Sequence, residues 1–211
     1  MADLGLVVPH DEEIGRFSDA LMRLTATLVN ERVELGTLNA FLGRRSIAGL
    51  LLILALPMAL PIPTPGISVI FGIPLILISA QLLIGRRRAW LPTRFTRRSI
   101  PRADFVAWVD RSLPMLYRFE QIVRPRVGWL AGDWVLIPVG AICLVLAVII
   151  TLPIPLGHMV PGAAISLLAL GLIERDGLVV AFGMIVAALG LAIVAAASAG
   201  IVATLRAWFG T

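Results

Sequence analysis

The sequence contains no lysine, a single cysteine and few charged residues of any kind. Charged side chains make up 15% of its 211 residues, whereas a soluble domain usually carries about 25%. This shortage argues against a soluble enzyme. The lone cysteine, Cys143, excludes a disulfide within the chain and a cysteine-based metal cluster.

Long uncharged runs account for most of the missing charge. Two windows of 40 residues, 46–85 and 134–173, contain no Asp, Glu, Lys or Arg, and 177–205 adds a run of 29. A membrane-spanning helix needs about 20 apolar residues. The sequence therefore predicts an all-α, polytopic membrane protein of the inner (cytoplasmic) membrane type, and its mean hydropathy of +0.95 agrees.

The charges that are present are unevenly placed. Residues 86–126 hold eleven arginines and three acids. Cytoplasmic loops of membrane proteins are enriched in arginine and lysine, so we expect this segment inside, in contact with membrane lipids, and we expect no nucleic-acid partner. Both hairpins then begin and end inside, which gives five crossings if they span the bilayer.

We predict five segments along the chain. Residues 1–45 form a cytoplasmic segment with an amphipathic helix near 10–30 and a second helix over 35–42. Residues 46–85 and 134–176 form two proline-broken helical hairpins, either spanning or re-entrant. Residues 86–133 form an arginine-rich interfacial helical segment, and residues 177–211 form a final transmembrane helix.

The two breaks resemble each other. Leu-Pro-Ile-Pro occurs at 60–63 and at 152–155, and Pro-Gly follows each time, at 65–66 and 161–162. Alternating prolines prevent a helix from continuing. Matched broken segments in two halves are typical of secondary transporters, but the motif could equally be a hairpin turn used twice. Parallel and inverted repeats both remain open.

The breaks and their surroundings supply the candidate site residues. The candidate substrate, ion or gating region comprises Pro61, Pro63, Pro65, Gly66, Gln81, Pro153, Pro155, His158 and Pro161. His158 lies either at membrane depth, where a histidine indicates a functional site, or at a loop tip in water. Gln81 lies one turn before the arginines, where a bond between helices would also explain it.

Two charged groups flank the hairpins. Arg86, Arg87 and Arg88 could bind anionic headgroups or a phosphate, although the positive-inside rule explains them without a ligand. Glu174, Arg175 and Asp176 predict a tight cytoplasmic turn with a local ion pair. No catalytic or metal-binding motif is recognisable, so we expect no catalytic residues, no metal and no cofactor.

Apolar residues in the arginine-rich segment repeat at helical spacing. Phe105, Val109, Leu113, Leu116, Phe119 and Val123 form one stripe, with Ser99 as the expected cap. Such a helix either lies in the headgroup plane or packs on the protein's own cytoplasmic face. In the last run, small residues every four positions from Ala188 to Gly200 permit close contact with the bundle or a second copy.

Several motifs follow one another along the chain: GRRS at 43–46, ALPMALPIPTPGIS at 55–68, GIPLILISAQLLIGRRRAWLP at 72–92, RRSIPRA at 97–103, LPIP at 152–155 and LGLIERDG at 170–177. In this order they resemble the exopolysaccharide synthesis ExoD family of bacterial membrane proteins. The resemblance implies an inner-membrane protein linked to exopolysaccharide production and, in some members, to alkali tolerance. It implies no known reaction and no catalytic residues.

These observations lead to one expected function and one alternative. We expect a non-catalytic accessory protein for exopolysaccharide synthesis or export, with the polysaccharide synthesis machinery and a second copy of the chain as partners. The alternative is a transporter or flippase for a small ion or a lipid-linked saccharide, with the two breaks as its site.

Overall fold

A computed structural model describes most of the chain. The described residues are 16–27, 31–43, 46–59, 67–86, 88–92, 96, 99–123, 133–152 and 158–209. The elements are α1 (Phe17–Thr27), β1 (Arg32–Glu34), α2 (Leu35–Leu42), α3 (Ser46–Ala59), α4 (Ile67–Leu83), β2 (Ser99–Pro101), α6 (Arg102–Ile122), the 3-10 turn η3 (Asp133–Val135), α7 (Leu136–Thr151), α8 (Met159–Glu174) and α9 (Gly177–Phe209). The helical class is confirmed, whereas the short antiparallel ladder of β1 and β2 was not predicted.

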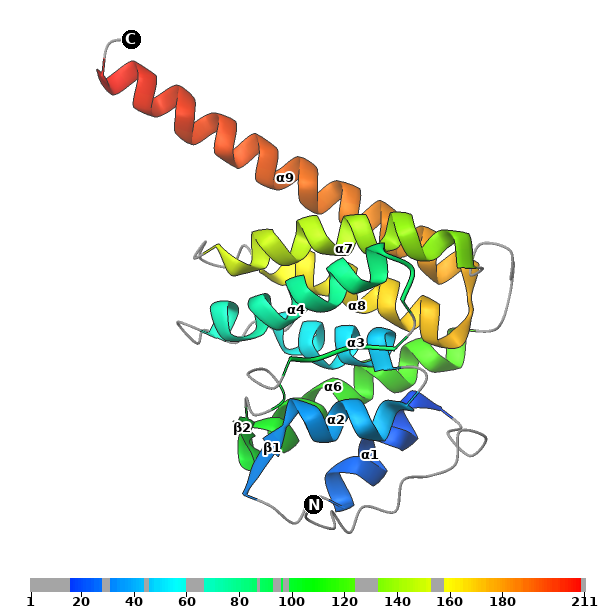
Figure 1. Cartoon of the computed structure of the whole chain (residues 1–211). Helices are drawn as coiled ribbons and strands as arrows, with labels where there is room; N and C mark the ends of the chain where they lie inside the picture. The colour runs from blue at the N-terminus through cyan, green and yellow to red at the C-terminus, as the bar shows by residue number, and fades with distance from the viewer. Residues whose placement is uncertain are drawn as a thin grey trace.

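Four apolar helices form the centre of the molecule (Figure 1). α3 packs on α8 and α4 packs on α7, so the main helix pairs join one hairpin to the other. Glycines allow these approaches. A Cβ on Gly162 would lie 2.8 Å from the Ala59 nitrogen, a Cβ on Gly72 would overlap Thr151, and one on Gly140 would overlap the Leu83 backbone.

These contacts show that both pairs are antiparallel and that both hairpins point the same way. α3 and α7 end, and α4 and α8 begin, at what we call the break end. The opposite end, where α4 runs into the arginines, is called the arginine end. Of the two arrangements that the sequence left open, parallel and inverted, the structure therefore shows the parallel one for the two hairpins.

A polar layer covers the outer side of α3 and α4 (Figure 1). It consists of α1, α2, α6 and the β1–β2 ladder, in which Val33 pairs with Ile100. α2 packs on α3, and the rings of Phe71 in α4 and Trp108 in α6 meet edge to face, with their centroids 5.2 Å apart. The sequence predicted that these elements lie beyond the ends of the expected membrane helices, but in the structure they lie along the side of α3 and α4.

The apolar stripe of α6 faces inward. Phe105, Val109, Leu116 and Val123 are buried, and Leu113 and Phe119 pack against the same core. The structure thus shows α6 packed on the protein's own surface. The expected Ser99 cap is wrong, because Ser99 lies in β2 and accepts a hydrogen bond from Arg32 Nε at 2.8 Å.

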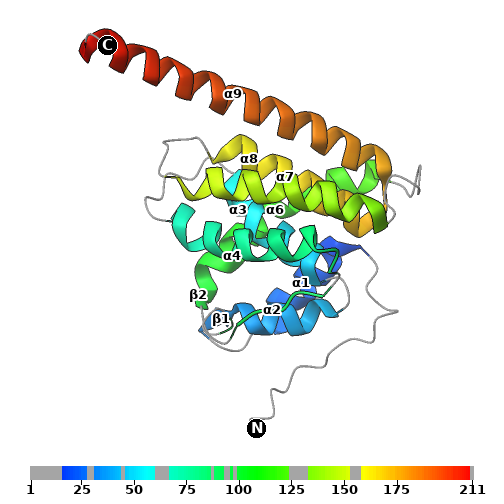
Figure 2. The same ribbon diagram turned by 45° about the horizontal axis from the view of Figure 1, so that its top comes forward.

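α9 has two different halves. Its first half runs back along α8, where Gly183 lies against Leu168 and Gly190 lies against Val160. Its second half extends past the break end, clear of the other helices (Figures 1 and 2). The expected small-residue ridge begins with Ala188, Ala192 and Ala196, which are exposed and therefore do not face the bundle.

Candidate functional site

The predicted site residues do not form one cluster. His158 and Pro161 lie at the break end, whereas Gln81 and the 174–176 turn lie at the arginine end. Seven of the candidates fall outside the described residues: Pro61, Pro63, Pro65, Gly66, Arg87, Pro153 and Pro155. The candidate region defined by sequence is thus divided between the two ends of the bundle.

At the break end, His158 joins the second break to the first hairpin. Its Nδ1 lies 3.2 Å from the carbonyl oxygen of Met58, and its side chain is half-buried. Met58 belongs to the last turn of α3, where carbonyl groups lack partners within the helix. A proton on Nδ1 would be donated to this carbonyl, so His158 can close the end of α3.

Pro161 belongs to a helix and not to the break. α8 begins at Met159, and Pro161 is buried in its first turn. Proline is tolerated there because the first helical N–H groups have no partner within the helix. The Pro-Gly pair at 161–162, which follows the second motif in the sequence, therefore lies within α8 and not in the break, and the Gly162 N–H donates to the His158 carbonyl at 2.9 Å.

At the arginine end, three side chains hold one short stretch of main chain, and we call this group the polar clasp. Gln81 accepts from the Trp90 N–H at 2.6 Å and donates to the Trp90 carbonyl at 2.8 Å. Ser46 accepts from the Ala89 N–H at 2.8 Å, and Asn39 donates to the Ala89 carbonyl at 3.2 Å. The clasp thereby satisfies every backbone polar group of Ala89 and Trp90.

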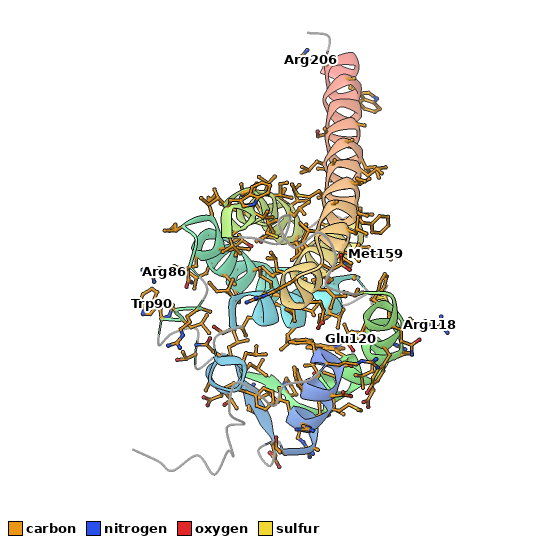
Figure 3. The ribbon with its side chains drawn as sticks, turned by 90° about the vertical axis from the view of Figure 1, so that its right-hand side faces the viewer. Arg86, Trp90, Arg118, Glu120, Met159 and Arg206 are labelled. Carbon is orange, nitrogen blue, oxygen red and sulfur yellow. The ribbon has the colours of Figure 1, made fainter. Side chains whose placement is uncertain are left out.

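The clasped segment alternates its side chains between the core and the surface. Ala89 and Leu91 are buried, whereas Trp90 is 61% exposed. Arg86 and Arg88 are exposed as well. Arg86 and Trp90 project from the same edge of the molecule, opposite Arg118 of α6 (Figure 3).

The clasp gives Gln81 a role that differs from both sequence-based interpretations. Gln81 neither lines a region near the breaks nor bridges two helices; it fixes a loop. Sequence reasoning missed Asn39 and Ser46, although one signal was available. Ser46 begins an apolar helix and Asn39 lies among the apolar residues of α2, and a polar side chain buried in such surroundings needs a hydrogen-bond partner.

The predicted turn at 174–176 is present. Arg175 ends α8 in the left-handed conformation, with φ of 53°. Asp176 is buried, and its Oδ1 accepts from the Leu178 N–H at 2.9 Å. Asp176 thus serves as the N-cap of α9, a role that the sequence did not suggest.

A carboxylate also ties α1 to α6. Glu120 is buried and accepts from the Ser18 backbone N–H at 2.8 Å and from the Ser18 hydroxyl. Nearby, the Tyr117 hydroxyl donates to Asp19 at 3.3 Å. Desolvation, followed by the Asp19 carboxylate, raises the pKa of Tyr117 above its ordinary value.

Within the described ranges, one helix is long and apolar enough to cross a membrane, over Gly177–Ala196. α3, α7 and α8 and the described part of α4 are apolar but shorter. In the same ranges, no group of three His, Cys, Asp or Glu side chains gathers as metal ligands.

This chain is similar to one family model and to two known proteins. The family model described as "Exopolysaccharide synthesis, ExoD" matches residues 17–196. "Protein ExoD" of Rhizobium meliloti is 32% identical over 173 residues, which cover 79% of this chain and 70% of that protein. An uncharacterized protein of Synechocystis sp. is 37% identical over 136 residues, which cover 64% of each chain. No solved structure matches.

Proposed function

Because this chain belongs to the ExoD family of exopolysaccharide synthesis proteins, we propose that it is a protein of the bacterial cytoplasmic membrane. Its role is to assist the synthesis or export of exopolysaccharide without catalysing a reaction of its own. Two observations support the proposal. The family is associated with exopolysaccharide synthesis, and the apolar surface is unevenly distributed over the molecule.

The observation that carries the membrane location is a one-sided apolar surface. Large apolar side chains are about half exposed along α7 and α9: Ile137, Val145, Val148, Leu152, Leu178, Phe182, Ile185, Leu189 and Ile193. Neither helix carries an acid, and the only charged residue of the two is Arg206 in the last turn of α9. Exposed apolar surface of this extent marks a membrane or protein interface.

The opposite side of the molecule is polar. Exposed charges on α6 include Arg102, Asp104, Asp110, Arg111 and Arg118. A charged side chain in hydrocarbon is costly, so this side belongs in water. The protein therefore lies with α7 and α9 in the hydrocarbon and with α6 outside it.

The short helices favour re-entrant hairpins. α3 has 14 residues and α4 has 17, lengths of about 21 and 26 Å at 1.5 Å per residue. The hydrocarbon core is about 30 Å thick. The polar layer along α3 and α4 requires water on that side as well, so the hairpins enter from the cytoplasm and return to it, while α9 crosses.

The contacts of the buried polar groups support a non-catalytic role. Ser46, Gln81, Glu120 and Asp176 each hold backbone groups. The transporter alternative gains no support from these contacts, because His158 and Gln81 lie at opposite ends of the bundle.

The exposed ridge of α9 suits a second copy of this chain. Ala188, Ala192 and Ala196 allow another helix to approach closely and face away from α8. We therefore retain a homodimer as part of the proposal. Cross-linking through single cysteines at Ala192, after Cys143→Ala, should trap dimers in membranes. Monomers alone would contradict this part.

Gene deletion tests the function. A bacterium that secretes exopolysaccharide should lose most of its secreted polymer when its ExoD-family gene is deleted, and this chain should restore it. A His158→Ala variant should restore secretion too, because the proposed role needs no titrating site. Unchanged secretion in the deletion strain would contradict the proposal.

Thiol labelling tests the re-entrant hairpins. In a Cys143→Ala background, single cysteines at Thr64 and His158 are exposed to a membrane-impermeant reagent in intact cells and in inverted vesicles. Re-entrant hairpins predict no labelling from outside. Labelling from outside alone would show spanning hairpins and would contradict the re-entrant arrangement.

A further inference from the structure

We propose that the polar clasp presents Trp90, together with Arg86 and Arg88, to the phosphate headgroups of anionic phospholipids at the cytoplasmic surface of the membrane. This inference rests on the proposed membrane location, and it assigns a lipid contact to a loop that the family resemblance leaves unexplained.

The loop at Ala89 and Trp90 is fixed by buried polar side chains. Ser46 is 1% exposed and Gln81 is 6% exposed, so two almost fully buried polar side chains are committed to this loop. Buried polar groups destabilise a fold unless they are hydrogen-bonded, and these two bond the main chain of Ala89 and Trp90. These bonds therefore hold the loop in one conformation.

The fixed loop leaves the Trp90 side chain exposed at the surface of the protein. Closing the end of the bundle needs only Ala89 and Leu91, which are buried. The Trp90 ring, 61% exposed, covers little of its own chain. An indole combines an apolar ring with an N–H donor, and tryptophan is accordingly enriched at the membrane–water interface.

The surroundings of Trp90 are positively charged. Arg86 and Arg88 precede Trp90 and are exposed, and no Asp or Glu occurs between residues 46 and 103. A guanidinium group pairs with phosphate through two parallel hydrogen bonds. Because the proposed membrane location puts the arginine end at the cytoplasmic surface of the bilayer, the phosphate-bearing ligand that fits is a phospholipid headgroup.

Lipid quenching of Trp90 tests the contact. In the full chain, Trp108, Trp129, Trp134 and Trp208 are replaced by Phe, so that Trp90 is the only tryptophan. The protein is reconstituted into vesicles that contain brominated phosphatidylglycerol or brominated phosphatidylcholine. We expect both lipids to quench Trp90 and the anionic lipid to quench it more strongly.

The arginines should account for that preference. Each basic residue at an anionic surface contributes at most about a fivefold preference. Arg86→Ala with Arg88→Ala should therefore reduce the preference for the anionic lipid by up to about 25-fold. Arg111→Ala with Arg118→Ala, on the exposed face of α6, is the matched control and should retain it.

Loosening the clasp should have a separate effect. Gln81→Ala removes both bonds to Trp90 but keeps the arginines, so quenching should become weaker and less selective. If this variant fails to fold, as judged by gel filtration in detergent, the arginine pair still decides the proposal.

The outcomes separate this inference from the proposed location. A protein that resists extraction by alkaline carbonate while Trp90 is unquenched would overturn the lipid contact and leave the membrane location standing. Equal quenching by both lipids, unchanged in the Arg86 and Arg88 variant, would also overturn it. A protein washed off by carbonate would overturn both.

Discussion

α3 and α9 are almost equally apolar, yet they meet different surroundings. Twelve of the 14 residues of α3 are buried, because α2, α4, α6 and α8 surround it. α9 leaves Phe182, Ile185, Leu189 and Ile193 more than half exposed. An apolar run in a sequence therefore indicates an environment without water, but it does not say whether protein or lipid supplies that environment.

Length separates the two helices where composition does not. α9 has 33 residues, or about 50 Å of helix, against about 21 Å for α3. A helix of about 21 Å is too short to cross a hydrocarbon core of about 30 Å, whereas a helix of about 50 Å is long enough to cross it.

A buried charge should have the largest effect. Leu50→Asp places a carboxylate in α3, where Leu50 is 0% exposed, and we expect a loss of more than about 4 kcal/mol and no folded protein. Ile185→Asp on α9 should leave a folded protein in detergent but weaken membrane insertion by about 3 kcal/mol. Gel filtration and carbonate extraction measure the two effects.

The next largest effect should come from truncating an apolar side chain, and it should differ between a buried and an exposed position. Leu54→Ala in α3 opens a cavity and should reduce the free energy of unfolding by about 2–5 kcal/mol. Leu189→Ala, at a position that is 57% exposed, should change it by less than about 0.5 kcal/mol in detergent. Denaturant unfolding in the same micelles compares them, and equal losses would contradict the assignment of the two environments.

Close helix approaches should come next. Gly140→Ala forces a methyl group into the Leu83 backbone and should cost about 1–3 kcal/mol. Gly200→Ala meets nothing within 4 Å, so it should be neutral or stabilise the helix by up to about 1 kcal/mol. Melting temperatures in detergent test the pair. A neutral Gly140→Ala would show that α4 and α7 do not pack this closely.

The carboxylate between α1 and α6 should have a smaller effect. Glu120→Gln weakens the two bonds to Ser18 and should cost about 1–2 kcal/mol. Asp110→Asn, an exposed change on the same helix, is the control and should be nearly silent. Protease resistance of the N-terminal segment provides a local measurement.

The smallest effect should appear at high pH. Tyr117 is the sole tyrosine, so the ultraviolet absorbance of tyrosinate reports it alone. Its raised pKa means that the unfolded chain loses the proton first, and stability should therefore fall as the pH rises above about 10. Asp19→Asn should lower the pKa of Tyr117; an unchanged titration would contradict the contact.

Local features could be predicted from the sequence because local chemistry determines them. Gly43 ends α2 with a positive φ of 51°, and the turn at Arg175 lies where the charges interrupt two apolar runs. The ladder could not be predicted, because three residues in each strand are too few to show alternation. Its pairing of Val33 with Ile100 also joins segments that are far apart in the chain.

The long-range contacts of the candidate site could not be predicted either, because they also join segments that are far apart in the chain. The bond between His158 and Met58 and the clasp around Trp90 both depend on how the hairpins cross. Periodicity predicted which residues form the apolar stripe of α6, but it could not distinguish a stripe covered by protein from one covered by lipid. In the structure the rest of the protein covers it.

Spin labels give the most direct test of the central claim that one side of the molecule faces lipid and the other faces water. Single labels at Val148 in α7, Ile185 in α9 and Arg111 in α6, in a Cys143→Ala background, are measured in vesicles with oxygen and with a water-soluble nickel chelate. We predict that oxygen relaxes the labels at 148 and 185, and that the chelate relaxes the label at 111. Chelate access to 148 and 185 equal to that at 111 would contradict the account.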